Sequence, residues 1–202
     1  MIRKSSFCES LLRTGRMKFR EQKINGVWLI EAEPLADARG AFRRHFCHLE
    51  FGQSGVESKI LQTGISDNYR KHTLRGFHYQ VKPFEEFKTL SCMRGAIYDV
   101  VVDLRPGSST FLQWISFELK AGDELSLHVP AGCANAYLTL EDSTTILYYM
   151  SEIYSAASYR GFRYDDPLFG VKWPVEPEII SEKDRSYPDF DPGMAGISSA
   201  QA

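Results

Sequence analysis

Long hydrophobic runs are missing from the 202-residue sequence. No apolar stretch reaches the roughly 18 residues that a transmembrane helix needs, and the N-terminus lacks the apolar core of a signal peptide. We therefore expect a cytoplasmic protein that does not enter a membrane. An excess of one charge is missing too, since the formal net charge is −2 and both signs are mixed along the chain. This balance gives no reason to expect nucleic acid as a partner.

Cysteine is scarce and unpaired. The sequence has no Cys-x-x-Cys pair and no Cys/His cluster at the spacing of zinc ligands. In the reducing cytosol, lone cysteines are best interpreted as small buried hydrophobic side chains. We expect that role, and neither disulfides nor metal binding, for Cys8, Cys47, Cys92 and Cys133. No metal or other cofactor is expected.

The length and composition suit one soluble domain with a substantial core. Hydrophobic residues make up 43% of the chain and charged residues 25%, as in ordinary globular proteins. Residues 1–16 are polar and without a clear period, and we interpret them either as a disordered N-terminal extension or as the product of a wrongly chosen upstream start codon. We expect the domain over residues 17–188 and a loose C-terminal tail over residues 189–202.

Helical patterns are rare, and short strand patterns take their place. Residues 24–33 are typical of a strand, which Pro34 ends. Residues 37–40 are typical of a turn, and residues 42–51 are typical of a short strand followed by one helical turn. Many short strands with few short helices predict an all-β fold, an antiparallel sandwich or barrel. Eight later segments are rich in β-branched or aromatic residues and bounded by Gly, Pro, Asp or Asn: 60–66, 73–80, 86–93, 96–103, 113–119, 124–129, 134–140 and 144–150.

One predicted strand, residues 74–80, carries a cation, an imidazole and an amide close together. Side chains alternate along a strand, so residues 74, 76, 78 and 80 are expected on one face and residues 75, 77 and 79 on the other. The histidine at position 78 is then either a satisfied core group or a proton-transfer group. Only the residues elsewhere in the chain can distinguish the core role from the proton-transfer role.

Several motifs occur in a fixed order along the chain, with no large insertion between them. They are MKF at 17–19, DARGAF at 37–42, LRGFHYQ at 74–80, RGAIYDVVVDLR at 94–105, VPAG at 129–132, YDDP at 164–167, VKWP at 171–174 and SEKD at 181–184. Together they resemble the dTDP-4-dehydrorhamnose 3,5-epimerase family. The resemblance implies a cupin-type jelly roll, usually a homodimer. It also implies epimerisation of a nucleotide-linked 4-keto-6-deoxy sugar in deoxysugar biosynthesis, for a surface polysaccharide or a glycosylated product.

Epimerisation beside a ketone requires a base that removes a C–H proton, a group that stabilises the enolate, and an acid on the other face. His78 suits the base, because an imidazole titrates near neutral pH. The resemblance implies that Lys88 holds the enolate oxygen through a charge-assisted hydrogen bond and that Tyr148 is the acid. Asp166 is expected to fix the tautomer of His78 and stabilise the imidazolium.

Each of these residues has an ordinary structural interpretation when it is taken alone. Tyr148 would be a core tyrosine with a satisfied hydroxyl, Lys88 a solvated strand residue, and Asp166 a turn former before Pro167. Their joint occurrence in the family's order favours catalysis.

The resemblance also implies a set of substrate-binding residues. Arg39 and Arg75 would hold phosphate and substrate, for which the planar guanidinium is well shaped. Gln62 and Asn135 match positions in the binding cleft. Tyr154 matches an aromatic residue that stacks on the nucleotide base; an aromatic side chain that covers the end of the core is the alternative.

The family pattern is broken at four positions. The second active-site histidine, in a Pro-x-Gly-x-x-His run, is Asn135 here, which can form hydrogen bonds but cannot carry charge. Arg44 and Tyr159 stand where acidic residues are expected, and Gly64 replaces an asparagine. The proton-transfer set is intact while the recognition residues have changed. This indicates the same reaction on a related substrate: CDP or GDP in place of dTDP, another sugar, or inversion at one carbon only.

Three other functions compete with this one. A metal-dependent cupin needs two closely spaced histidines and a carboxylate in its first motif and a histidine in its second, but the chain offers His78-Tyr79-Gln80 and Asn135. A sugar 3,4-ketoisomerase begins with the same enolisation and moves the carbonyl instead of inverting a carbon. A catalytically silent sugar-nucleotide-binding cupin is the third, and the retained His78, Lys88, Tyr148 and Asp166 argue against it.

Overall fold

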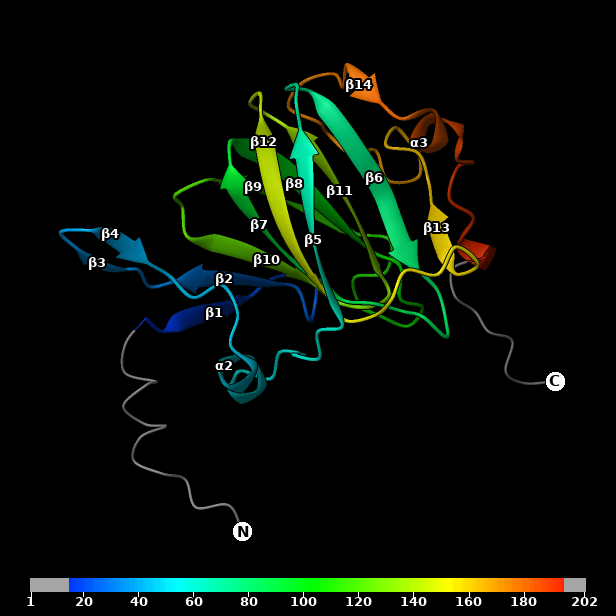
Figure 1. Cartoon of the computed structure of the whole chain (residues 1–202). Helices are drawn as coiled ribbons and strands as arrows, with labels where there is room; N and C mark the ends of the chain where they lie inside the picture. Colours follow the sequence, from blue (N-terminus) through cyan, green and yellow to red (C-terminus); the bar gives the residue numbers. More distant parts are fainter. Residues whose placement is uncertain (1–14, 195–202) are drawn as a thin grey trace, which may run out of the picture.

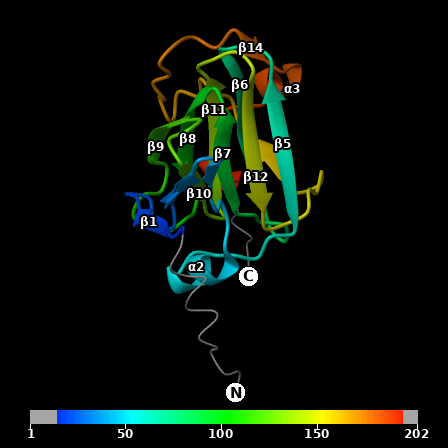
Figure 2. The same ribbon diagram turned by 60° about the vertical axis from the view of Figure 1, so that its left-hand side comes forward.

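Two six-stranded sheets face one another and form a jelly roll (Figures 1 and 2). The computed structural model describes residues 15–194. Expectations about residues 1–14, Cys8 included, and about residues 195–202 lie outside this range. The all-β prediction is confirmed, and within the described residues only short helices accompany the strands.

The first sheet is antiparallel, with strand order β1-β2-β10-β7-β12-β5. Its edge strand β5 and the neighbouring β12 pair over seven residues each, from Gln62↔Met150 to Asn68↔Thr144. The strands of this sheet are β1 (Met17–Glu21), β2 (Trp28–Ala32), β5 (Gln62–Asn68), β7 (Lys88–Arg94), β10 (Leu125–Val129) and β12 (Thr144–Met150).

The second sheet has the order β13-β6-β11-β8-β9, and the short β14 pairs with β6 in parallel. Its central strand β11 is buried along its whole length, because both faces of that strand are covered. The strands are β6 (Thr73–Gln80), β8 (Ala96–Asp103), β9 (Trp114–Lys120), β11 (Cys133–Thr139), β13 (Tyr159–Gly161) and β14 (Ile179–Ile180).

The remaining elements lie at the edges of the roll. A small hairpin, β3 (Leu35–Asp37) with β4 (Gly40–Phe42), projects beyond β1 and β2 in Figure 1. The helix α2 (His48–Gln53) follows it, and α3 (Glu182–Ser186) and the single turn η1 (Pro192–Met194) come near the C-terminus. Within residues 15–194, no helix is long and apolar enough to cross a membrane.

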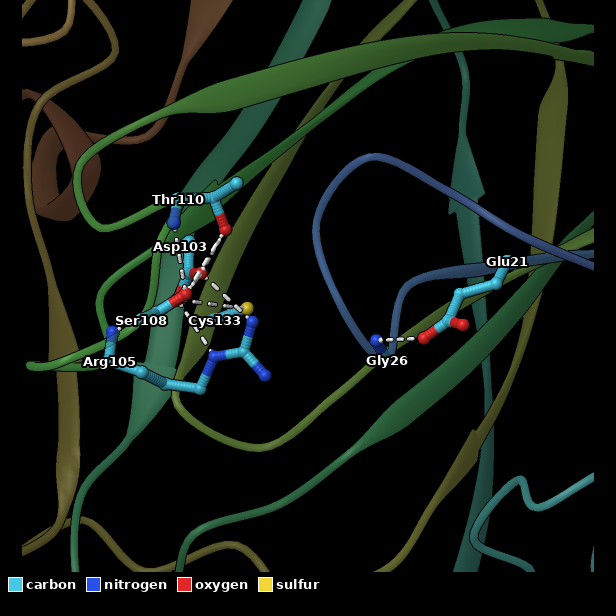
Figure 3. Close-up of polar contacts among 7 residues, drawn as sticks. All are labelled: Glu21, Gly26, Asp103, Arg105, Ser108, Thr110 and Cys133. Carbon is cyan, nitrogen blue, oxygen red and sulfur yellow. Dashed lines mark hydrogen bonds and ion pairs between the residues drawn. The ribbon is translucent and has the colours of Figure 1, made fainter.

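The predicted strands 73–80, 96–103 and 144–150 match β6, β8 and β12 residue for residue. The predicted strand over residues 24–33 is too long, because a tight turn occupies its first part. The Val27 amide donates to the carbonyl of Ile24, and the Gly26 amide donates to the side chain of Glu21 at 3.0 Å (Figure 3). The short strands β13 and β14 and the helix α3 were not predicted.

Apolar side chains fill three regions of the described residues, one of which is a small cluster of Met17, Ile30, Phe51 and Val56 beside α2. Of the two larger regions, one lies between the sheets and includes Leu90, Ile97, Leu127 and Ile146. The other is an aromatic cluster on the β6, β8 and β11 sheet, in which the rings of Phe77 and Phe162 stack at 4.7 Å. Burying large aromatic rings in this way is a main source of stability.

The expectation of a loose tail from residue 189 is wrong for its first residues. Phe190 is only 9% exposed and packs against Phe162 and Phe169. Its backbone amide donates to Asp166. Burial of the apolar Phe190 ring holds this part of the tail against the core.

A polar cluster at the end of β8 holds the turn that leads to β9 (Figure 3). The buried carboxylate of Asp103 accepts hydrogen bonds from Arg105, Ser108 and Thr110. Burial acts to raise the pKa of Asp103, but these bonds outweigh it and lower the pKa to about 2.

The cysteines that the structure describes are all free thiols. Cys92 and Cys133 are buried, as predicted, and Cys47 is half-buried. Burial raises the pKa of Cys92 to about 11 and that of Cys133 to about 12, so both are neutral at physiological pH.

Candidate active site

A cavity of about 280 Å³ brings together seven of the nine residues that the sequence predicted for the site. It is lined by strands of both sheets: β5, β7 and β12 from the first, β6 and β11 from the second. The predicted residues that line it are Gln62, Arg75, His78, Lys88, Asn135, Tyr148 and Tyr154. Ser66, Glu86, Tyr137, Met150 and Tyr159 complete the lining.

The strict alternation predicted for residues 74–80 fails in the middle of β6. His78 pairs with Asn135 and Arg75 pairs with Tyr137, so three steps along β6 face two steps along β11. This irregularity brings Arg75 and His78 to the cavity together, while Phe77 between them points to the aromatic cluster. A bulge of this kind re-aims side chains beside a functional site.

Glycine is required at the irregularity. Gly76 has a φ of +117°, and a Cβ atom there would lie 2.6 Å from Cβ of Ala136 and 2.7 Å from its Cα. Any side chain would collide with β11. The sequence motif contains this glycine, but the motif alone did not indicate that it lets both functional side chains share a face.

The partner of His78 is Asp184. Nε2 of His78 lies 2.7 Å from Oδ1 of Asp184, and the Gly76 amide donates to Oδ2 of the same carboxylate. Asp184 is held by α3, whose N-cap residue Ser181 accepts a hydrogen bond from the Asp184 amide. Burial acts to raise the pKa of Asp184, but the bond to His78, the Gly76 amide and the Ser181 side chain outweigh it, so the pKa is lowered.

The expectation that Asp166 supports His78 is therefore wrong. Its carboxylate accepts hydrogen bonds from the amides of Leu168 and Phe190, and it stabilises the loop between β13 and the C-terminal segment. An aspartate before a proline commonly binds nearby backbone amides in this way. The sequence does hold a signal for the true partner, since Asp184 ends the SEKD motif at 181–184.

Lys88 and Tyr148 come from neighbouring strands of the first sheet. Nζ of Lys88 lies 3.3 Å from Oε1 of Glu86. Burial raises the pKa of Tyr148 far above its usual value, and Tyr137 and Asp99 nearby raise it further. Tyr148 therefore keeps its proton at neutral pH and is available as a donor.

A hydrogen-bond network holds Arg75 in place. Nε of Arg75 donates to Oδ1 of Asn68 at 2.8 Å, and the hydroxyl of Tyr137 donates to the same oxygen at 3.3 Å. Ser66 bonds to that hydroxyl at 2.9 Å.

Three lining residues on β5, β11 and β12 were not predicted from the sequence: Ser66, Tyr137 and Met150. Each lies an even number of positions from a predicted residue on the same strand. The period-two alternation of a strand would therefore have found them.

Aromatic rings form one wall of the cavity. Tyr154 is 54% exposed and its ring lies 5.2 Å from that of Tyr159, which in turn lies 5.2 Å from the ring of His78. Nζ of Lys183 sits 4.5 Å from the centre of the Tyr159 ring. Tyr159, where the family pattern has an acid, thus borders both His78 and the predicted base-stacking residue.

Arg39 does not line this cavity. It sits at the turn of the β3–β4 hairpin, and its side chain is 90% exposed and pairs with Asp37. Arg44, another position that departs from the family, is bound to Glu50 at 2.6 Å. Among residues 15–194, no three His, Cys, Asp or Glu side chains are grouped to hold a metal ion.

The fold and the site together define a jelly-roll protein equipped for proton transfer at a carbon atom. Residues 21–192 match the model of the family described as dTDP-4-dehydrorhamnose 3,5-epimerase. A protein of that name from Sinorhizobium fredii is 38% identical over 175 residues, covering 86% of this chain and 90% of that protein. The chain belongs to the dTDP-4-dehydrorhamnose 3,5-epimerase family.

Solved structures agree with this assignment. The dTDP-4-dehydrorhamnose 3,5-epimerase from Bacillus anthracis, determined with TDP and PPi bound, superimposes with a TM-score of 0.83 at 36% identity, covering 86% of this chain and 99% of that one. A 3′-monoepimerase from Streptomyces bikiniensis in complex with dTDP-quinovose gives a TM-score of 0.78 at 32% identity, covering 84% of this chain and 86% of that one. The family resemblance inferred from the motifs is confirmed.

Proposed function

We propose that the protein is an epimerase that inverts C3, C5 or both of a nucleotide-linked 4-keto-6-deoxyhexose. The observation that carries the proposal is the meeting of two proton-transfer groups from opposite sheets in one cavity. His78, paired with Asp184, comes from β6 of the second sheet, and Tyr148 comes from β12 of the first. Inversion needs a base on one face of the carbon and an acid on the other.

The chemistry follows from the charges around the cavity. Ionised Asp184 bonded to His78 favours the imidazolium that forms when His78 takes a proton from the carbon beside the ketone. Lys88 then stabilises the negative enolate oxygen. Protonated Tyr148 returns a proton from the opposite side and completes the inversion.

Substrate recognition is assigned to the remaining predicted residues of the cavity. The cation of Arg75 suits the diphosphate, Gln62 and Asn135 offer hydrogen bonds to the sugar, and the exposed ring of Tyr154 suits a nucleotide base. The relatives named above bind TDP and dTDP-quinovose. We infer a dTDP-sugar as the first substrate to test, with CDP and GDP as alternatives because Asn135, Arg44, Gly64 and Tyr159 depart from the family.

We infer that the protein is a cytoplasmic homodimer. The β3–β4 hairpin supports dimerisation, because a two-stranded hairpin alone is marginally stable and Phe42 on it is 65% exposed. Packing against a second copy would cover that ring and could bring Arg39 to the partner's cavity, where it would contact phosphate. Light scattering after gel filtration should give a dimer, and F42E should shift it toward monomer; a monomeric wild type would contradict this.

Solvent exchange tests the activity. The protein is incubated in deuterated water with dTDP-, CDP- and GDP-linked 4-keto-6-deoxyhexoses, and incorporated deuterons are counted by mass spectrometry and located by NMR. H78A should abolish incorporation. H48A, which removes an exposed histidine of α2, is the matched control and should behave as wild type.

The number and position of deuterons separate the possible outcomes. Two deuterons with one nucleotide would define a double epimerase and its carrier, and one would define a monoepimerase. A displaced carbonyl would identify a 3,4-ketoisomerase instead. Binding without exchange for any of the three sugars would overturn the proposal in favour of a silent sugar-nucleotide-binding protein.

A further inference from the structure

The carboxyl group of Asp99, on β8, lies directly behind the cavity and has no role in the reaction described so far. The residue is 0% exposed. Oδ2 lies 3.2 Å from Nδ2 of Asn135, and Oδ1 has no hydrogen-bond partner within residues 15–194. Buried carboxylates normally satisfy both oxygens, so this arrangement requires an explanation.

The surroundings of Asp99 do not favour a negative charge. The ionisable groups that influence it are Lys88 from β7 and Tyr148 from β12, while β11 contributes Asn135 and, in register with Asp99, Tyr137. Burial raises the pKa of Asp99 well above its usual range, and Asn135 and Lys88 offset only part of that. A buried carboxylate with one neutral partner and one bare oxygen is costly, whereas a neutral acid is tolerated.

We propose that Asp99 is a positioning residue that, as a neutral acid, donates its hydroxyl proton to Oδ1 of Asn135 and so turns Nδ2 of Asn135 toward the cavity. The separation of 3.2 Å fits this arrangement, because rotating the amide by half a turn exchanges its oxygen and nitrogen in nearly the same place. A neutral carboxyl group donates to an oxygen, whereas a carboxylate would accept from Nδ2.

The orientation of the amide matters for the proposed function, on which this inference rests. With Nδ2 facing the cavity, Asn135 donates a hydrogen bond to the developing enolate oxygen and works with Lys88. With Oδ1 facing the cavity, it would repel the same oxygen. Asp99 thus fixes the orientation in which Asn135 donates a hydrogen bond, at a position where the family pattern has a histidine.

Two substitutions at position 99 separate orientation from simple packing. In D99N the new amide can still donate to Oδ1 of Asn135, whereas in D99L it cannot. We expect D99L to lower the rate constant of deuterium incorporation by roughly tenfold to a hundredfold, the range for a lost donor to a developing charge, with little change in KM. D99N should lose far less. Equal impairment of the two variants would overturn the proposal.

The pH profile gives a second readout. Incorporation by the wild type should decline on the alkaline side as Asp99 ionises and turns the amide around. D99N, which cannot ionise, should lack that decline. An identical alkaline limb in the wild type and D99N would contradict the proposal.

A measurement without substrate separates this inference from the proposed function. In protein labelled with carbon-13 at aspartate carboxyl carbons, the Asp99 signal is assigned by its absence from D99N. It should have the chemical shift of a neutral carboxylic acid at pH 7. A carboxylate shift would overturn the inference even if the enzyme were active. This NMR test requires neither a substrate nor D99L, so it decides the inference even if no sugar incorporates deuterium or D99L fails to fold.

Discussion

Nε2 of His78 and Oδ1 of Asp184 lie 2.7 Å apart although 106 residues separate them in the chain. The contact joins the middle of β6 to the short helix α3. The same carboxylate accepts the Gly76 amide at the irregularity of β6. One acidic side chain therefore positions both the imidazole and the backbone that presents it.

Replacing this carboxylate should impair proton abstraction specifically. We expect D184N to reduce deuterium incorporation by about a hundredfold or more, because the imidazolium loses its counter-charge. D166N is the matched control: it should lower the free energy of unfolding by about 1 kcal/mol, since a backbone amide loses its acceptor, and leave the rate per folded molecule unchanged. The assignment of Asp184 would be wrong if D166N were the variant that lost exchange.

Removing the Tyr148 hydroxyl should separate the two halves of the reaction. Y148F retains His78 and Asp184, so proton abstraction and deuterium incorporation should continue, while inversion at one or both carbons stops because the acid is missing. Mass spectrometry reports the first and NMR coupling constants the second. Y149F, on the same strand but outside the cavity lining, should behave as wild type. Loss of exchange and inversion in equal measure would refute the role of Tyr148 as acid.

A methyl group at Gly76 should destabilise the whole domain. The collision with Ala136 and the positive φ act together, and we expect G76A to cost about 3 kcal/mol or more in the free energy of unfolding. G52A is the control, because Gly52 lies in α2 and a Cβ atom added there would meet nothing within 4 Å. Urea unfolding monitored by circular dichroism compares the two variants; equal stability of G76A and G52A would show that β6 can relax.

Stability should fall in acid partly through Asp103. Its pKa is about 2 in the folded protein against an ordinary value of 3.8, so its contribution is complete above about pH 4 and is lost as the pH falls toward 2. That contribution is about 2 kcal/mol at neutral pH. Unfolding free energies measured between pH 7 and pH 3 should decline more steeply for the wild type than for D103N. Parallel curves would exclude this role.

Much of the fold was predictable because its strands follow local rules. Short runs of apolar and β-branched residues are bounded by turn-forming residues. For this reason the ends of β6, β8 and β12 were predicted to the residue. The short strands β13 and β14 were not, since three or two residues carry too little pattern. They pair only because β6 already provides an edge.

The residue types of the site were likewise predictable, but not all of their partners. By itself the sequence determined the family, the jelly roll, and the presence of His78, Lys88 and Tyr148, because composition, periodicity and ordered motifs are properties of the chain. Tertiary structure alone decided that Asp184 and not Asp166 meets His78, that Arg75 shares its face, and that Asp99 lies behind Asn135. Those relationships depend on strand register and on packing between distant segments, which no local pattern encodes.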